Sequence, residues 1–162
     1  MSDTKYFPTV EAIDKASQVL DEILEPTPFQ RNANLSDIYE AEVYLKREDL
    51  QIVRSYKIRG AYNKIRTIDP ELVKNGIVCA SAGNHAQGVA YAAQCYGVKS
   101  VIVMPTNTPF IKVNRTKSYG AEVVLHGDVY DEACAHALEL AEKEGYTFIH
   151  PFDDLAVATG QG

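Results

Sequence analysis

The sequence has few cysteines, no basic block and no long apolar run. Cys79, Cys95 and Cys134 are odd in number and widely spaced, so neighbouring cysteines cannot form a disulfide framework or a CxxC-type metal site. The longest apolar runs, such as VIVM, are far shorter than a membrane span. The polar N-terminus lacks the apolar segment of a secretion signal. These absences favour a cytoplasmic protein with free thiols and no metal site.

Positive charge is also scarce. The chain has 16 Lys and Arg residues against 22 Asp and Glu residues, which gives a net charge of −6. Because phosphate binding depends on clustered cations, such a chain is a poor candidate for nucleic acid or for an anionic membrane surface. Its 162 residues, 46% apolar and 23% charged, are typical of a globular domain that can bury a core.

Short apolar runs alternate with helical segments in the second half of the chain. The runs lack polar alternation, as strands buried on both faces do. This order predicts βαβ units, and therefore an α/β fold with a parallel sheet and flanking helices over about residues 76–155. In the clearest helix, Asp128 suits the N-cap and Gly145 the C-terminal end. Strands are expected at 76–81, 100–105, 121–127 and 146–151, and helices at 84–97, before Tyr119–Gly120 and at 128–145.

The first 75 residues follow a different pattern. An amphipathic helix is expected over 9–24, extended chain at the prolines of EPTPF and a half-buried strand over 41–49. A further helix begins near Tyr56 and ends at Asp69–Pro70. The last segment, DDLAVATGQG, starts like a helix and stops at Gly162, so we expect the chain to be cut from a longer one.

The stretch VCASAGNHAQG (78–88) contains the first chemical motif. A predicted strand runs into Ser-Ala-Gly-Asn and then into a helix start, where free N–H groups and the helix dipole form an anion site. Ser81 and Asn84 add side-chain donors, and Gly83 lets the backbone approach a ligand closely. The same residues also suit an ordinary turn with an Asn N-cap, and so short a motif does not decide between the two.

The stretch SYKIRGA (55–61) surrounds one lysine with an aromatic residue and two small residues. On a helix, Gly60 and Ala61 are expected to leave open space beside Lys57, and Tyr56 offers a flat face. These neighbours suit a planar ring attached to Lys57, and partial burial would lower the pKa of its amine and make it a nucleophile. The alternative is a surface lysine on a cationic helix.

Together the two stretches resemble the serine/threonine dehydratase family. EDLQIVRSYKIRGA (48–61) is similar to the family's pyridoxal-phosphate attachment segment, and SAGNHAQGVA (81–90) is similar to its asparagine loop. MPTNTPFIKVNRTKSYGAEV (104–123) and FIHPFDD (148–154) extend the resemblance to essentially the whole chain. KREDLQ (46–51) resembles the biosynthetic threonine enzymes more than the catabolic ones or serine racemase.

The resemblance implies part of a fold-type II enzyme, similar to the tryptophan synthase β chain. Residues 1–55 would begin its large domain, 56–155 would hold the lysine helix and the small α/β domain, and 156–162 would return to the large domain. The family more often has phenylalanine at the position of Tyr56, and the tyrosine retains the aromatic face. The family's glycine-rich phosphate loop and the polar partner of the pyridine nitrogen are expected beyond Gly162.

The function that the resemblance implies is a threonine ammonia-lyase, which converts L-threonine to 2-oxobutanoate and ammonia in isoleucine biosynthesis. Lys57 would bind pyridoxal 5'-phosphate and move the α-proton, with Tyr56 against the cofactor ring and Asn84 at the ring oxygen. A loop would bind the substrate carboxylate through its N–H groups. Its residues are Ser81, Ala82, Gly83, Asn84 and His85.

Two other interpretations remain open. In the first, the chain would be a non-catalytic α/β module that binds a small carboxylate, because it lacks the phosphate loop. In the second, the enzyme would act on serine as a dehydratase or racemase. The full-length protein is expected to be a homo-oligomer with a small amino-acid substrate. His85 is expected to contribute its backbone rather than act as a general base. His126, His136 and His150 show no ligand spacing and are expected to be ordinary surface or strand-end residues.

Overall fold

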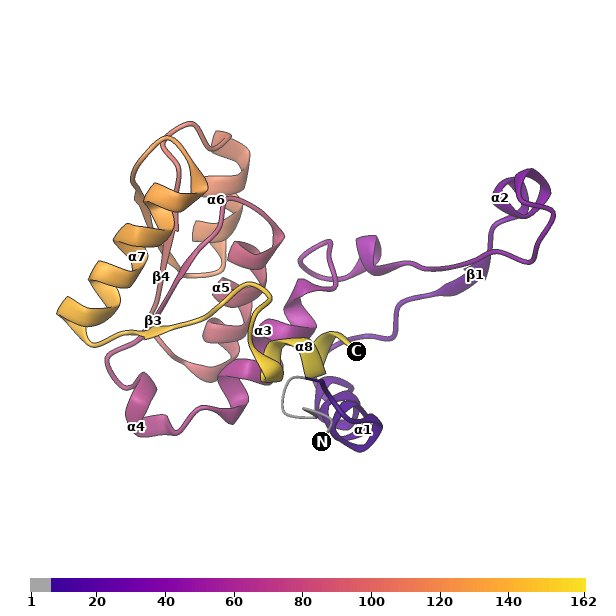
Figure 1. Ribbon diagram of the computed structural model, residues 1–162, viewed down its shortest axis with the longest axis horizontal. Coiled ribbons are helices and arrows are strands. Elements are labelled where there is room, and N and C mark those ends of the chain that lie inside the picture. The colour runs from indigo at the N-terminus through magenta and orange to yellow at the C-terminus, as the bar shows by residue number, and fades with distance from the viewer. Residues whose placement is uncertain (1–6) are drawn as a thin grey trace, which may run out of the picture.

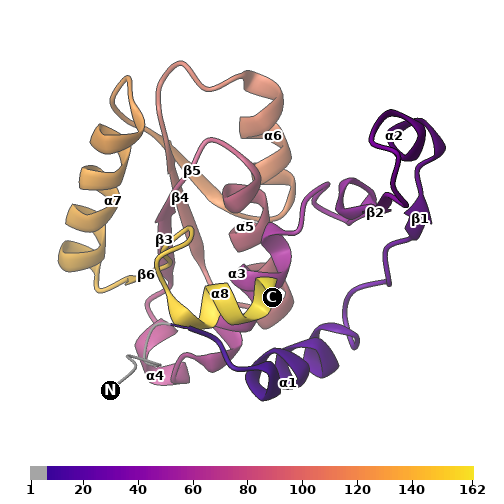
Figure 2. The same ribbon diagram turned by 45° about the vertical axis from the view of Figure 1, so that its right-hand side comes forward.

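The computed structural model of the protein describes residues 7–162. It has a three-layer body from which an N-terminal arm projects (Figures 1 and 2). A four-stranded sheet is the middle layer, and α7 (Tyr130–Glu144) covers one of its faces. The helices α3 (Lys57–Thr67), α5 (Asn84–Tyr96) and α6 (Phe110–Ser118) lie on the opposite face.

The sheet is parallel throughout, with the strand order β5-β4-β3-β6. The two central strands, β3 (Ile77–Ala80) and β4 (Ser100–Met104), are buried along their whole length. The outer strands are β5 (Glu122–Leu125) and β6 (Thr147–Phe148). The predicted α/β fold with a parallel sheet and flanking helices is therefore confirmed.

Each central strand has apolar residues on both faces, which is why the sequence shows no polar alternation there. Ile77 and Cys79 of β3 face the core under α3, α5 and α6, whereas Val78 and Ala80 face α7. The smaller cluster, on the α7 side, consists of Val78, Ala80, Val101, Val103, Ala133 and Ala137.

The last strand is shorter than the expected strand over 146–151. The N–H of Ile149 still donates to β3 at 2.8 Å, but Pro151 has no N–H with which to continue the ladder. The chain then turns and enters α8 (Leu155–Gln161). Asp154 is the N-cap of α8, and its carboxylate accepts two backbone N–H groups of the first turn at 2.8 and 3.0 Å.

The helix α7 begins later than the sequence predicted. Its N-cap is Val129, and the predicted N-cap at Asp128 is wrong. The Asp128 carboxylate instead accepts the Thr106 hydroxyl at 2.8 Å, and its N–H donates to Glu132 at 2.6 Å. The predicted end at Gly145 is confirmed, because this residue has φ 70°, a left-handed conformation that glycine adopts without strain.

The N-terminal part consists of α1 (Val10–Leu20) and the arm. The helix α1 packs against α3 and α8, which places the first and last described helices side by side (Figure 1). The arm has a two-stranded antiparallel ribbon, β1 (Phe29–Arg31) with β2 (Tyr44–Lys46), and the short helix α2 (Ala33–Ile38). The strand expected over 41–49 is thus present but shorter and more exposed.

Two short helical segments, a 3-10 turn at Glu48–Leu50 and α4 (Pro70–Val73), complete the described structure. The three cysteines all lie in the described residues and form no disulfide. No helix of the described part is long and apolar enough to cross a membrane.

Candidate active site

Lys57 is the first residue of α3 and reaches the turn that follows β6. Its Nζ donates to the carbonyl of Pro151 at 2.9 Å and lies 5.4 Å from the centre of the Tyr56 ring. The Ser55 hydroxyl accepts the Lys57 N–H at 3.2 Å, one of the donors that a helix start leaves free. Burial lowers the pKa of the Lys57 amine, as the sequence predicted. A lowered pKa makes this amine a better nucleophile near neutral pH.

The N-terminal part of α5 lies directly beside the backbone of Lys57. Gly88 permits this approach, because a Cβ at that position would lie 3.1 Å from the Lys57 carbonyl carbon and oxygen. His85, three residues before Gly88, is near enough for the charge of Lys57 to lower the pKa of its ring. The structure therefore brings together the two stretches that the sequence singled out. Gly88 was missed, because only the packing of two helices shows what its missing side chain leaves room for.

The loop between β3 and α5 is open to a ligand. The Ser81 hydroxyl accepts the Gly83 N–H at 3.1 Å, and a Cβ on Gly83 would meet no heavy atom within 4 Å. Ala82 lies between them and is partly exposed. The N-cap of α5 is Gly83, so the alternative of an Asn N-cap is wrong. Asn84 is the first helical residue, and its exposed amide is not used as a cap.

The His85 side chain points into the interior. It is 4% exposed, and its Nε2–H donates to the Ile149 carbonyl at 3.2 Å. Its Nδ1 is buried with no partner among the described residues. Burial lowers the pKa of His85 to about 4, although the bond to Ile149 acts in the opposite direction. The ring is therefore uncharged at neutral pH, and the backbone N–H is the group that His85 has for a ligand.

Gly60 and Ala61 do not leave open space beside Lys57, so that prediction is wrong. Gly60 lies against α8, where a Cβ would be 2.6 Å from the Val157 carbonyl oxygen and would overlap the Gln161 side chain. Ala61 is completely buried in the core. The small residues of the lysine helix serve helix packing, because α8 fills the face that the sequence suggested was empty.

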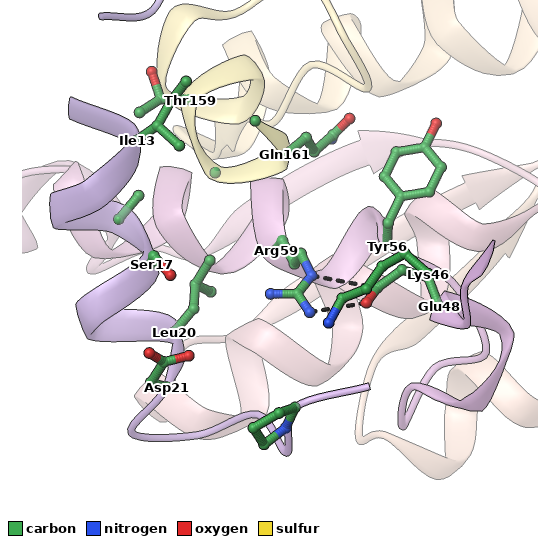
Figure 3. A pocket seen from close by; sticks show the side chains of 14 residues that line it. Ile13, Ser17, Leu20, Asp21, Lys46, Glu48, Tyr56, Arg59, Thr159 and Gln161 are labelled. Atoms are coloured by element: carbon green, nitrogen blue, oxygen red, sulfur yellow. Dashed lines mark hydrogen bonds and ion pairs between the residues drawn. The ribbon is translucent and has the colours of Figure 1, made fainter. Parts of the chain in front are cut away.

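A cavity of about 320 Å³ lies beside the start of α3, between α1, α8 and the end of the arm (Figure 3). Tyr56 lines it, but Lys57 does not. Arg59 points into it and donates from Nε and Nη2 to the Glu48 carboxylate at 2.9 and 2.8 Å. The charges of Arg59 and Glu48 in this cavity are therefore paired with each other.

The turn after β6 is the part of the site that the sequence did not single out. His150 accepts the N–H groups of Phe152 and Asp153 on its Nδ1, at 3.3 and 2.7 Å. His150 lies just past the end of β6, at the strand end where it was expected, and these bonds are the feature that the sequence did not show. The rings of His126 and His136 stack with their centres 4.0 Å apart, far along the chain from the site loop.

Comparison with known proteins decides the family. The profile described as "Pyridoxal-phosphate dependent enzyme" matches residues 20–162. The chain belongs to this family. Pyridoxal phosphate is therefore the cofactor that the site must be tested against, and the resemblance found in the sequence is confirmed.

Two curated members of the family show how specific the similarity is. The chain is 49% identical over 156 residues to the L-threonine dehydratase biosynthetic IlvA of Bacillus subtilis, a match that covers 94% of the chain. It is 47% identical over 154 residues to the L-threonine ammonia-lyase of Thermotoga maritima, which covers 95% of it. The chain spans 37% and 38% of the length of these relatives.

Solved structures of the pyridoxal-phosphate family share the fold. The chain superposes on a threonine deaminase isoform from Solanum lycopersicum with a TM-score of 0.83 at 42% identity. It superposes on maize serine racemase with a TM-score of 0.90 at 30% identity. These matches cover 95% and 96% of the chain, and 44% and 47% of the two structures. The expected fold of type II pyridoxal-phosphate enzymes is confirmed.

Proposed function

We propose that the chain contributes the lysine side of the active site of an L-threonine ammonia-lyase. The observation that supports this most directly is that one turn joins the two stretches. The Pro151 carbonyl accepts Nζ of Lys57 at 2.9 Å, and the Ile149 carbonyl accepts Nε2–H of His85 at 3.2 Å, so the amine lies near an anion-binding helix start. The relatives named L-threonine dehydratase and L-threonine ammonia-lyase, at 49% and 47% identity, support the reaction class.

The residues present fit pyridoxal phosphate. Lys57 is partly buried, which lowers the pKa of its amine, and it is the residue that would hold the cofactor through its aldehyde. The Tyr56 ring, 46% exposed, offers an aromatic face beside the amine. Asn84 presents an exposed amide as a donor to the ring oxygen. When bound, the cofactor supplies the electron sink that makes the α-proton of an amino acid removable.

The protein's own groups would bind the substrate and move its protons. The N–H groups of Ser81 and Gly83 are already bonded, to the Val103 carbonyl and the Ser81 hydroxyl. Those of Ala82, Asn84 and His85, at the positive end of the α5 dipole, would hold the substrate carboxylate. The open space beside Gly83 leaves room for that carboxylate. The freed Lys57 amine would remove the α-proton, because its lowered pKa leaves more of it unprotonated near neutral pH. Loss of the substrate hydroxyl, which leaves with a proton as water, would give aminocrotonate. Hydrolysis of this product by a water molecule yields 2-oxobutanoate and ammonia.

A second candidate is the same chemistry on serine. The similarity to maize serine racemase, with a TM-score of 0.90, favours it, because the site loop and Lys57 do not distinguish the two side chains. Assays of the full-length protein for 2-oxobutanoate from threonine and for pyruvate and D-serine from L-serine separate the candidates.

The domain division is a further proposal. We assign 1–55 to the start of the large domain and 56–155 to the lysine helix and the small domain. Residues 156–162 are assigned to the segment in which the chain returns to the large domain. Its support is the separation of the arm from the three-layer body (Figure 2). A cytoplasmic location and self-association of the full-length protein also stay predictions, which cell fractionation and light scattering test.

Titration of the purified chain with pyridoxal phosphate tests the cofactor assignment. We expect a visible absorption band, and borohydride reduction should fix the cofactor to Lys57, as peptide mass spectrometry shows. Lys57→Ala should abolish both signals, whereas the exposed Lys74→Ala should retain them. A folded chain that gives neither signal would contradict the proposal and favour the non-catalytic α/β module.

A further inference from the structure

The turn after β6, which we define as the site turn (residues 149–154), touches both halves of the candidate site. The carbonyl of Ile149 accepts Nε2–H of His85 at 3.2 Å. Two residues later the carbonyl of Pro151 accepts Nζ of Lys57 at 2.9 Å. A single short segment therefore fixes the orientation of one group on α5 and one on α3.

The two ends of the site turn are anchored. Ile149 is completely buried, and its N–H continues the ladder with β3 at 2.8 Å. At the other end, Asp154 caps α8 and pairs with Lys64 of α3 at 2.6 Å. Both side chains of that pair are about four-fifths buried, at 20% and 23% exposed. Between these anchors, the bond from Lys57 of α3 to the Pro151 carbonyl is accompanied by bonds made within the turn itself.

His150 makes those bonds. Its Nδ1 accepts the N–H groups of Phe152 and Asp153 at 3.3 and 2.7 Å. A nitrogen that accepts carries no hydrogen, so the ring is the neutral tautomer with its proton on Nε2. The two bonds close the backbone around Pro151, which lies between the acceptor and the donors. They therefore set the direction of the Pro151 carbonyl.

We propose that His150 is a positioning residue for Lys57, because it holds the site turn so that the Pro151 carbonyl faces the lysine amine. Lysine has a long flexible side chain, and a fixed acceptor removes much of the freedom that it would otherwise have. The importance of this contact for catalysis rests on the proposed function of Lys57. The contact itself is a property of the chain without cofactor.

Two substitutions distinguish the effect of the His150 hydrogen-bond acceptor from the effect of its ring. His150→Asn keeps an acceptor, since an Asn side chain bonds the backbone N–H two residues on, but it removes the ring. His150→Phe keeps a ring of similar size and removes the acceptor. If the Phe variant does not fold, His150→Ala removes the acceptor without introducing a new ring. Circular dichroism and urea unfolding identify the folded variants.

The measurement is competitive acetylation of Lys57 across pH, followed by mass spectrometry, in the chain without pyridoxal phosphate. It reports the pKa of the amine and its reactivity once it is unprotonated. Lys74, which is exposed and far along the chain from the site turn, is the internal reference. Hydrogen exchange at Phe152 and Asp153 reports whether the bonds to residue 150 are present.

Removal of the His150 acceptor should release the Pro151 carbonyl from Lys57 and let water reach the lysine amine. Loss of the carbonyl acceptor by itself favours the neutral amine, but burial is the cause that lowers the pKa of Lys57, so we expect the labelling midpoint of His150→Phe to rise and less free amine to be present at pH 8. Exchange at Phe152 and Asp153 should become about tenfold faster, consistent with the loss of their acceptor. His150→Asn should match the wild type in both measurements, and Lys74 should not change.

The proposal is overturned if the folded Phe or Ala variant labels like the wild type, or if the Asn variant shifts as far as the Phe variant. The first result would show that the turn does not need the acceptor, and the second would show that the ring itself matters. Since the test contains no cofactor, a chain that fails to bind pyridoxal phosphate still gives a decisive result. A chain that binds it but shows unchanged labelling overturns the positioning role alone.

Discussion

Arg59 and Glu48 form a two-bond ion pair between α3 and the end of the arm, with Nε to Oε2 at 2.9 Å and Nη2 to Oε1 at 2.8 Å. Both side chains are mostly buried, at 20% and 16% exposed. The Thr27 hydroxyl adds a third bond to the same carboxylate. Because Arg59 lies two residues after Lys57, this pair connects the projecting arm to the first turn of the lysine helix.

We expect Glu48→Gln to lower the free energy of unfolding by about 1.5–3 kcal/mol, because it weakens charge-assisted bonds and removes the carboxylate that is hydrogen-bonded to the partly buried Arg59. Burial acts to raise the pKa of the Glu48 carboxyl, but the bonds from Arg59 and Thr27 outweigh it and hold the pKa below its usual range. The carboxylate is therefore ionised at neutral pH. Urea unfolding at pH 7 measures the effect.

The control for this substitution is a similar pair in an exposed position. Arg47 and Asp49 also form two bonds, at 2.9 and 2.8 Å, but their side chains are 38% and 59% exposed. Asp49→Asn should leave the unfolding free energy nearly unchanged, because water screens exposed pairs. Equal losses for the two substitutions would contradict the importance of the Glu48–Arg59 pair.

Gly60→Ala should destabilise the chain by about 1–3 kcal/mol, the usual range for an added group in a packed contact. Its Cβ would lie 2.6 Å from the backbone oxygen of Val157, so α8 must move away from α3. Thermal or urea unfolding measures this loss. Gln94→Ala, at an exposed position of α5, is the control and should change stability by less than about 0.5 kcal/mol. A Gly60 variant as stable as that control would show that the two helices are not in close contact.

We expect the buried His85 to make the protein less stable as the pH falls. Its pKa is lowered by burial from its ordinary 6.5 to about 4, so between these values the unfolded chain binds more protons than the folded chain. The stability that this histidine contributes is full above pH 6.5 and is lost as the pH falls to about 4, by on the order of 3 kcal/mol. Unfolding free energies at half-unit steps of pH test this.

His85→Gln is the matched variant for the acid window, because its amide can donate to Ile149 but does not titrate. The loss of stability across that window should be smaller in the variant by the His85 contribution. If the two proteins lose stability in parallel, another group is responsible and the ring of His85 is not buried in the neutral form.

The amino-acid sequence by itself determined the parallel sheet and the family. Apolar runs such as that of β3 are buried on both faces wherever they fold, and the order of strand and helix leaves few topologies. The SYKIRGA and SAGNHAQG stretches also predict Lys57 and the Ser81–His85 loop as site residues, because chemistry requires these residue types in a local order.

The tertiary structure decided what each small or polar residue contacts. Gly60 was expected to give room to a ring and instead contacts α8, whereas Gly88 is the residue that brings α5 to Lys57. His150 and Pro151 join the site from the turn after β6, and the bond from Lys57 to Pro151 spans 94 residues of sequence. Local patterns cannot specify such contacts, because they depend on how distant helices and turns pack around the sheet.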